Sequence, residues 1–344
     1  MISRWTVVVD RDDLTKTEVL HDELSPELGD CEVLLRTGHV GLTANNVTYG
    51  VVGDRIGYWN FFPVPAEGRG VIPLWGFADV VGSTLDAIPP GTRVYGYLPM
   101  SSHLVVRAKL TSSGFVDTVD HRAELPAVYN SYLIATDPES EDLQVLYRPL
   151  FMTSFLLADQ LTDNDFHGAR TVVISSASSK TAFGTAQCLR ASGVRLVGLT
   201  SPRNVEFTES LGLYDTVLPY DAQVDVEPSV YLDFSGSADV RSALHDRLGP
   251  SLVKAISIGL TGQKSSADPR SRFFFAPEQL RKRTADWGPE GFAERFGTAW
   301  SAFTAQARDW VAIKHHHGPD ELVEVWQSVL AGKTNPDTAD VITF

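Results

Sequence analysis

Cysteine is scarce in this chain: its 344 residues contain only Cys31 and Cys188. The two lie in different regions without CxxC spacing, which argues against a disulfide framework and against a thiolate zinc site. Long apolar runs are also missing, because no stretch approaches the ~20 apolar residues that a membrane-spanning helix needs. The N-terminus lacks the apolar core of a signal peptide. These absences favour a cytoplasmic protein that does not enter a membrane.

Positive charge is in short supply too. Lys and Arg number 29 against 43 Asp and Glu, and the formal net charge is −14. A field of that sign repels phosphate backbones and anionic membranes, so nucleic acid and membrane surfaces are excluded as partners. We expect a small-molecule substrate. An anionic cofactor would bind only where local donors and cations overcome the overall charge.

The first 130 or so residues carry the pattern of a β domain. Short runs rich in β-branched and aromatic residues are separated by Gly, Pro and Asp turns. These runs are TVVVD, CEVLLRTGHVGL, FADVVGST, TRVYGYL and HLVVRA. Many short strands at this spacing indicate a barrel or a sandwich.

After Tyr129 strands and helices alternate, which predicts a parallel, doubly wound sheet. The expected strands are TVVIS, RLVGLT, DTVLPY, SVYLDFSG and VKAISIGL, with Phe273–Phe275 in a last buried strand. The tail returns to mixed structure and ends in the strand ADVITF. Because a final strand often pairs with an early one, we predict a discontinuous first domain, 1–135 with 308–344, interrupted by an α/β domain at 136–307.

Glycine is missing where a nucleotide-binding loop would have it. The segment VVISSASSKTAFGTAQCL, Val172–Leu189, reads as strand, turn and helix, with small residues spaced by three at Ser176, Ser179 and Ala182. Small side chains let a phosphate approach the backbone at a helix N-terminus, and hydroxyls and a lysine add donors. The other interpretation is a plain turn whose serines cap the helix. The predicted phosphate contacts are Ser176, Ser178, Ser179, Lys180 and Thr181.

A carboxylate is missing from the end of the second strand of this domain. Enzymes that prefer NAD place Asp or Glu there, against the ribose 2′-hydroxyl. Here the strand runs into Gly198-Leu-Thr-Ser-Pro-Arg-Asn204. Ser201 and Arg203 suit a 2′-phosphate, so the pattern predicts NADP(H). An ordinary loop with one exposed arginine is the alternative.

The same loop also resembles the end of a P-loop, because Lys180-Thr181 follows a strand and a turn. However, Ser179 replaces the glycine before the lysine, and Ile174 stands where the opening glycine belongs. Asp233 could imitate a second acidic motif. A P-loop-like NTPase therefore stays open as a lower-ranked alternative.

The order of these segments resembles the medium-chain dehydrogenase/reductase superfamily, in its zinc-free quinone-oxidoreductase-like branch. CEVLLRTGHVGLTANNVTYG, PPGTRVYGYLPMSSHLVV, VVISSASSKTA and PDELVEVWQSVLAGKTNPDTADVITF carry the resemblance. It implies an α/β protein in which a GroES-like β-barrel domain is interrupted by a doubly wound Rossmann domain. It further implies cofactor contacts at Ser235 and Gly259, and a homodimer.

The ligands of the zinc-dependent members are absent. Where those members have a cysteine and a Gly-His-Glu segment, this chain reads Thr43-Ala44 and Trp75-Gly76-Phe77. The run His315–His317 is not expected to bind metal, because only His315 and His317 would share a strand face and no thiol lies nearby. We expect an exposed or packing role for these histidines and no metal site.

The loop from Thr43 to Tyr49 resembles the active-site loop of that superfamily. Asn46 matches its polar or acidic position, Tyr49 is the first candidate for the proton donor, and Tyr58 is the second. The alternative for each tyrosine is a buried aromatic whose hydroxyl is satisfied. The aromatic segment that follows could line a substrate cleft or fill a core. The predicted pocket residues are Asn45, Trp59, Tyr129 and Asn130.

Taken together, these patterns predict a zinc-independent, NADPH-dependent oxidoreductase. The implied reaction is hydride transfer to an enone, enoyl or quinone-type substrate, with an enolate stabilised and protonated by Tyr49 or water. Two alternatives stay open besides the P-loop: a catalytically silent NADP(H)-binding protein and a partner-binding protein of the same fold.

Overall fold

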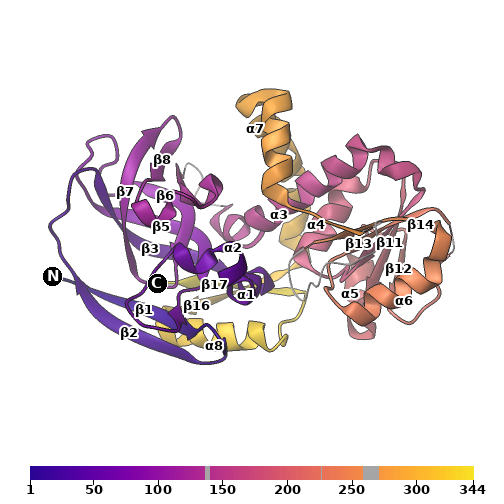
Figure 1. The fold of residues 1–344 in the computed structure, drawn as a ribbon, viewed down its shortest axis with the longest axis horizontal. Coiled ribbons are helices and arrows are strands. Elements are labelled where there is room, and N and C mark those ends of the chain that lie inside the picture. Colours follow the sequence, from indigo (N-terminus) through magenta and orange to yellow (C-terminus); the bar gives the residue numbers. More distant parts are fainter. Residues whose placement is uncertain (136–139, 226, 259–270) are drawn as a thin grey trace. The chain divides into compact units, whose positions relative to one another are not determined.

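The chain folds into two compact units, which Figure 1 shows with the element labels used below. This computed structural model describes residues 1–135, 140–225, 227–258 and 271–344. Unit 1 combines Met1–Leu146 with Ala312–Phe344, and unit 2 is Tyr147–Val311. Among the described helices, none has the length and apolar character needed to span a membrane.

Six antiparallel strands of unit 1 close into a barrel. In order around the barrel they are β3 (Glu32–Leu42), β5 (Pro73–Ser83), β6 (Arg93–Pro99), β9 (Ser131–Ile134), β8 (Gly114–Asp117) and β7 (His103–Thr111). The barrel closes because residues 32–36 of β3 pair with β7 while the rest of β3 runs on. Side chains that point inwards fill a barrel of this size, and Val33, Leu35, Val94 and Val106 are fully buried.

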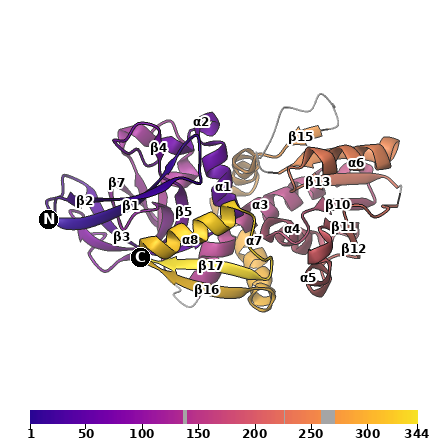
Figure 2. The ribbon, with the colours of Figure 1, turned by 90° about the horizontal axis from the view of Figure 1, so that it is seen from below.

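The C-terminal strands extend the barrel sheet outwards from β3. β17 (Thr338–Thr343) pairs antiparallel with residues 39–42, and β16 (Ala312–His317) pairs parallel with β17. The prediction that the final strand joins an early one is therefore confirmed. Helix α8 (Gly318–Leu330) lies along these strands (Figure 2) and buries Leu322 and Trp326.

Short elements complete unit 1. β1 (Ile2–Asp10) pairs with β2 (Thr17–Leu24) and β4 (Arg69–Gly70) in a separate small sheet. The others are α1 (Ala44–Val51), α2 (Gly53–Ile56), η1 (Tyr58–Asn60), η2 (Asp120–Arg122) and η3 (Ala127–Asn130).

Unit 2 contains a six-stranded parallel sheet. Its order is β12 (Thr216–Pro219), β11 (Arg195–Thr200), β10 (Thr171–Ser175), β13 (Ser229–Asp233), β14 (Leu252–Ser257) and β15 (Ser271–Phe273). The chain builds outwards from β10 on one side and then restarts with β13 on the other. The crevice at such a reversal, at the carboxyl ends of the strands, is where ligands bind in open α/β sheets. The predicted Rossmann architecture and the predicted barrel are both confirmed.

The helices of unit 2 are α4 (Lys180–Leu189), α5 (Val205–Ser210), α6 (Ala238–Leu248) and α7 (Ala276–Trp310), together with most of α3 (Glu141–Asp163). Aromatic rings pack α3 against α7, and Phe151 stacks on Phe303 at 4.5 Å. α7 contains a break at Gly288 (φ 72°). The expectation of a buried strand at Phe273–Phe275 is correct only in part. Phe274 is buried, but Phe273 and Phe275 are 40% and 38% exposed, because β15 is an edge strand that ends at Phe273.

A buried ion pair links the end of β8 to η2 in unit 1. Arg122 and Asp117 are each 1% exposed and 3.2 Å apart. Arg122 also donates to the Phe61 carbonyl and to the Tyr132 hydroxyl. Burial raises the pKa of Asp117 even though Arg122 opposes the shift. Arg122 therefore connects the segments that contain Asp117, Phe61 and Tyr132, and both charges of the pair are buried away from solvent.

Replacing Arg122 with methionine should lower the free energy of unfolding by about 3–5 kcal/mol, because it leaves the Asp117 carboxylate buried without its partner. Urea unfolding followed by near-ultraviolet circular dichroism measures the loss. Arg107→Met is the control, since the Arg107–Asp120 pair is exposed and 3.5 Å apart and should matter little. Equal losses in the two variants would contradict the argument.

Candidate functional site

The serine loop of unit 2 adopts the conformation that a glycine would normally supply. β10 ends at Ser175, and Ser176 has φ +48°, a left-handed conformation that residues with a Cβ rarely adopt. Tyr220 stabilises it: the Ser176 N–H donates to the Tyr220 hydroxyl at 3.0 Å, and the two hydroxyls are 3.2 Å apart. A serine thus replaces the glycine with the help of a tyrosine that follows β12.

The next serines tie the loop to its neighbours. The Ser178 hydroxyl accepts from Thr200 Oγ1, at the end of β11, at 3.1 Å and from Asn204 Nδ2, in the turn that follows, at 3.2 Å. Ser179 is the N-cap of α4, where its hydroxyl accepts from the Ala182 N–H. The capping role considered for these serines is therefore present at Ser179. It leaves the positive end of the helix directed at the loop.

The end of β13 forms a second ordered turn beside this loop. Asp233 is 1% exposed and pairs with Arg241 at 2.8 Å. Its Oδ1 also accepts from the Ser235 hydroxyl and from the Gly236 N–H. Ser175 joins the two turns, because its hydroxyl accepts from the Phe234 and Ser235 N–H groups. Asp233 is thus a structural carboxylate rather than an open metal ligand of an NTPase.

Most of the predicted cofactor residues come together at one edge of the sheet. They follow β10, β11 and β13, and parallel strands have their carboxyl ends at the same edge. Lys180, Thr181 and Ser201 are half-buried and Arg203 is exposed. The Ser235 hydroxyl donates to Asp233 and accepts from the Ser237 N–H, so it stabilises the turn itself, and its contact with a cofactor stays a prediction. Gly259 lies outside the described residues.

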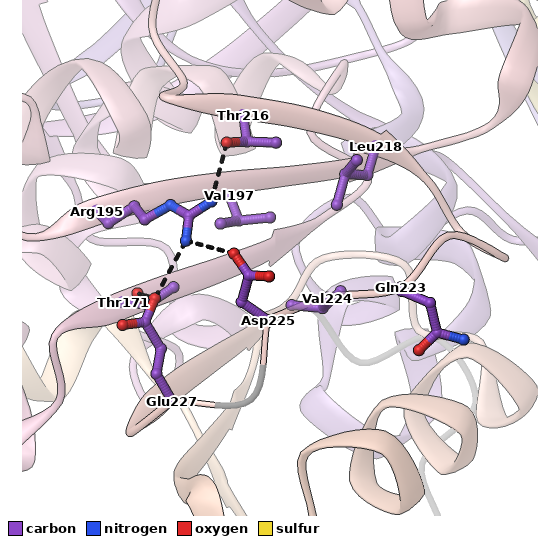
Figure 3. A pocket seen from close by; sticks show the side chains of 9 residues that line it. All are labelled: Thr171, Arg195, Val197, Thr216, Leu218, Gln223, Val224, Asp225 and Glu227. Carbon is purple, nitrogen blue, oxygen red and sulfur yellow. Dashed lines mark hydrogen bonds and ion pairs between the residues drawn. The ribbon is translucent and has the colours of Figure 1, made fainter.

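A pocket also opens between the amino ends of these strands (Figure 3). There Arg195 donates to Asp225 at 2.7 Å, to Glu227 at 3.3 Å and to Thr216 at 3.3 Å. These charges satisfy one another and tie β11 to the segment before β13. The pocket therefore has a structural explanation, and it lies at the opposite edge from the serine loop.

In unit 1, Tyr49 lies at the centre of an aromatic group that follows β3. It is 5% exposed, and its hydroxyl accepts from Asn45 Nδ2 at 2.8 Å and from Trp75 Nε1 at 3.3 Å. Neither donor can accept a hydrogen bond through those N–H groups. The Tyr49 hydroxyl hydrogen is therefore left for another acceptor, and the Tyr97 hydroxyl lies within hydrogen-bond reach of it.

Three more tyrosines surround Tyr49, and we call Tyr49, Tyr58, Tyr97 and Tyr129 the tyrosine cluster. The Tyr49 and Tyr58 rings are 4.7 Å apart, as are those of Tyr97 and Tyr129. The Tyr58 and Tyr129 hydroxyls are 3.1 Å apart. Burial is the largest cause that raises the pKa of all four hydroxyls. They therefore stay protonated and neutral at physiological pH.

Three of the residues predicted for this site are buried and make contacts within unit 1. Asn46 is buried, its Oδ1 accepts from the Thr43 N–H at 2.8 Å, and its Nδ2 donates to the Pro73 carbonyl at 2.9 Å. Both ends of its amide thus cap α1 and fix the loop, and the catalytic role of Asn46 stays a prediction. Trp59 is 2% exposed and packs where Cβ atoms on Gly53 and Gly70 would be. Asn130 is buried and donates to the Arg122 carbonyl.

Two residues of the site were missed as site residues. Trp75 on β5 pairs across the ladder with Tyr97 on β6, and their rings are 5.0 Å apart. The signal was the alternation in RVYGYL, which puts Tyr95 and Tyr97 on one face of a strand. Trp75, Asn45 and Tyr129 are half-buried and form the more open side of the cluster.

Comparisons with known proteins agree with this architecture. The family profile described as "Protein of unknown function (DUF2855)" matches residues 40–335. No curated protein matches the sequence significantly.

Solved structures match over nearly the whole chain. CurA from Vibrio vulnificus in complex with NADPH has a TM-score of 0.62 at 14% identity, covering 99% of this chain and 98% of that one. The yhdH oxidoreductase from Salmonella enterica in complex with NADP gives 0.57 at 13%, with 99% of both chains covered. The quinone oxidoreductase from Coxiella burnetii gives 0.56 at 13%, again with 99% of both. At these identities the similarity establishes the fold.

The raised pKa values of the tyrosine cluster predict an alkaline loss of stability. Tyrosines of the unfolded chain ionise near pH ~10, while those of the folded cluster stay neutral. The unfolded state therefore releases protons first, and the free energy of unfolding falls as the pH rises above about 10. Tyr49→Phe should reduce that slope by up to ~1.4 kcal/mol per pH unit.

Urea unfolding at a series of pH values between 8 and 11 measures the slope. The control is Phe61→Leu, which disturbs the packing against Tyr58 and Tyr97 without removing a hydroxyl. It should lower stability at every pH and leave the slope unchanged. If Tyr49→Phe also leaves the slope unchanged, Tyr49 does not titrate as its burial implies.

Proposed function

We propose that this chain, which belongs to the DUF2855 family, is an NADP(H)-dependent oxidoreductase that works without a catalytic zinc ion. The observation that carries the proposal is the carboxyl edge of the sheet in unit 2. There a capped helix N-terminus meets a loop of serines next to the β10–β13 reversal. This is the place and the electrostatic environment in which α/β sheets bind dinucleotide phosphates.

The residues at this edge fit NADP(H) in particular. The α4 N-terminus with Ser178, Ser179, Lys180 and Thr181 would hold the pyrophosphate. Ser201 and Arg203 would hold the 2′-phosphate, since no carboxylate stands between Thr200 and Asn204 to accept a free ribose hydroxyl. Two of the similar structures above hold NADPH or NADP, which supports this choice.

When bound, NADPH supplies a hydride. The substrate class we propose is an enone, an enoyl compound or a quinone, in which hydride addition places negative charge on a carbonyl oxygen. The tyrosine cluster supports that class, because flat conjugated molecules stack on aromatic rings and the developing oxyanion needs a neutral donor. One similar structure is a quinone oxidoreductase.

Tyr49 is the residue we assign to the oxyanion. Its hydroxyl already accepts two N–H groups, which orient it and leave its hydrogen to donate. Because burial raises its pKa, Tyr49 keeps its proton and acts through a hydrogen bond, so the proton that completes the reaction comes from water. The resemblance puts Thr43-Ala44 and Trp75-Gly76-Phe77 where zinc-dependent members of the superfamily have their ligands, and neither segment offers a thiolate, imidazole or carboxylate.

A catalytically silent NADP(H)-binding protein is the second candidate. The low exposure of Tyr49, 5%, favours it, because a substrate needs access to that hydroxyl. This alternative predicts cofactor binding without turnover of any enone, quinone or aldehyde.

Arg203→Ala should weaken NADPH binding by roughly 10–100-fold and leave NADH binding unchanged, because only NADPH carries the 2′-phosphate that the guanidinium would contact. Fluorescence titration with each cofactor measures both constants. Arg190→Ala is the matched control, an exposed arginine at the other end of α4. Equal weakening of the two cofactors, or an equal effect of Arg190→Ala, would overturn the assignment of Arg203.

Tyr49→Phe should lower kcat by about 10²–10³-fold with an enone or quinone substrate and leave the Kd for NADPH unchanged. Steady-state NADPH oxidation across a panel of such substrates tests this. Tyr147→Phe removes a buried tyrosine hydroxyl from unit 2 and should have little effect on kcat. A wild-type chain that binds NADPH and reduces no member of the panel would favour the silent protein instead.

A further inference from the structure

Two histidines and an aspartate converge in unit 1, apart from the tyrosine cluster. They are His39 on β3, Asp142 in the first turn of α3 and His315 on β16, and one ligand atom of each lies within 4.8 Å of the others. One Asp142 oxygen contacts His39 Nε2, and the other lies 3.5 Å from His315 Nε2. The two imidazole rings are 6.1 Å apart.

The barrel extension places the two histidines on one face of the sheet. β17 lies between their strands, with Thr343 opposite His39 and Val341 opposite both His315 and Gly41. Directly opposed residues point to the same face, and alternate residues of a strand do so too. His39 and His315 therefore face the same side from two strands that are not adjacent.

Helix α3 supplies the carboxylate because a glycine lets it approach. A Cβ on Gly41 would lie 2.4 Å from the Val145 carbonyl oxygen, so the first turns of α3 run directly over this face. Arg93 fixes the helix start, donating to both Glu141 oxygens at 2.5 and 2.6 Å and to Asp79 at 2.8 Å. Asp142 is thus held over the histidines by contacts that do not involve it.

We propose that His39, Asp142 and His315 bind a divalent transition-metal ion, with Zn²⁺ as the best fit. Two imidazoles and one carboxylate are a ligand set that zinc uses when water completes its coordination. Ligand atoms about 2.0–2.1 Å from a tetrahedral ion lie about 3.4 Å from one another, so binding would separate the hydrogen-bonded His39 and Asp142 atoms and place the ion between them. Their side chains are 17%, 33% and 50% exposed, which leaves a side open to water.

A further contact orients one ligand. His39 Nδ1 lies 3.4 Å from Thr343 Oγ1, while its Nε2 faces Asp142. A metal-bound imidazole commonly has its second nitrogen held by such a partner, which fixes the ring and the tautomer. No metal site was predicted at His315–His317 from the sequence. The two residues that meet His315, which are His39 and Asp142, are far from it in the chain.

The site joins the points at which the chain leaves and re-enters unit 1. The chain leaves after Leu146, just beyond Asp142, and returns at Ala312, just before His315. A bound ion would tie both segments to β3 and so stabilise unit 1 in the folded state. The stabilisation grows with the concentration of free ion relative to its Kd.

The test is a titration of the metal-stripped full chain with Zn²⁺ in competition with a chromogenic chelator, with Co²⁺ absorption as a second readout of coordination. We expect one ion per chain. His39→Ala should weaken Zn²⁺ binding at least ~10-fold while it keeps the run of three histidines intact. His317→Ala breaks that run and keeps the proposed ligands, so its Kd should stay within about twofold.

Circular dichroism establishes that each variant is folded, and the half-exposed His315→Ala replaces His39→Ala if the latter does not fold. An equal loss in His317→Ala would show that the histidine run binds the ion as a surface tract, and would overturn the proposal. Absence of stoichiometric binding at micromolar Zn²⁺ would overturn it as well, leaving Asp142 as a hydrogen-bond partner of the two imidazoles. NADPH affinity is independent of each result.

Discussion

Strand β3 is the element on which unit 1 depends, because it pairs with three others. Its first half closes the barrel with β7, its second half pairs with β17, and β5 runs along most of its length. A strand normally has two edges, so the third partner is possible only because β7 and β17 occupy different stretches of the same edge. The early part of the chain, the barrel and the C-terminal strands are thereby held in one unit. β3 also carries His39 and ends where the loop to Tyr49 begins.

The serine loop shows how a nucleotide-type turn is built without glycine. The left-handed conformation of Ser176 costs on the order of 1–3 kcal/mol for a residue with a Cβ. The Tyr220 hydroxyl offsets this by accepting from its backbone N–H. Ser178 is fixed in the same way by Thr200 and Asn204. The loop is therefore ordered by the protein itself, at the cost of the Ser176 N–H, which a glycine loop would leave for phosphate.

The fold could be predicted from the sequence because it depends on local signals that add up. Alternating strands and helices after Tyr129 predicted the Rossmann unit. The short aromatic strands predicted a barrel or a sandwich, and the family resemblance favoured the barrel. The candidate site could be predicted only in part. Which side chains meet there depends on how neighbouring strands are paired, and the sequence does not show that pairing. Nothing local distinguishes Asn45, which reaches Tyr49, from Asn46, which caps the helix. Tyr97 and Trp75 meet only because β5 and β6 pair in one particular register.

The proximity of His39, Asp142 and His315 could not be predicted either, because it depends on how β16, β17 and β3 pair. His315 lies on a strand whose parallel pairing with β17 has no short-range signal, and Asp142 belongs to an acidic stretch that resembles a solvated loop. What brings them together is the missing side chain of Gly41, which lets a helix backbone approach the sheet. In the tyrosine cluster and in the group of His39, Asp142 and His315, a small residue or the pairing of two strands determines which polar side chains meet. The sequence alone identifies these side chains only as candidates.

The tyrosine cluster sets a limit on the chemistry that unit 1 can perform. Burial raises the pKa of all four phenols, and neighbouring tyrosines raise the pKa of Tyr49, Tyr97 and Tyr129 further, so ionising any of the four is unfavourable. A group of this kind is a poor source of protons and a good source of neutral hydrogen bonds. It therefore fits the reaction proposed above, in which negative charge develops on the substrate and is delocalised, as in an enolate or a reduced quinone. None of these four tyrosines can act as a general base at physiological pH, because each would first have to lose its proton and burial raises its pKa.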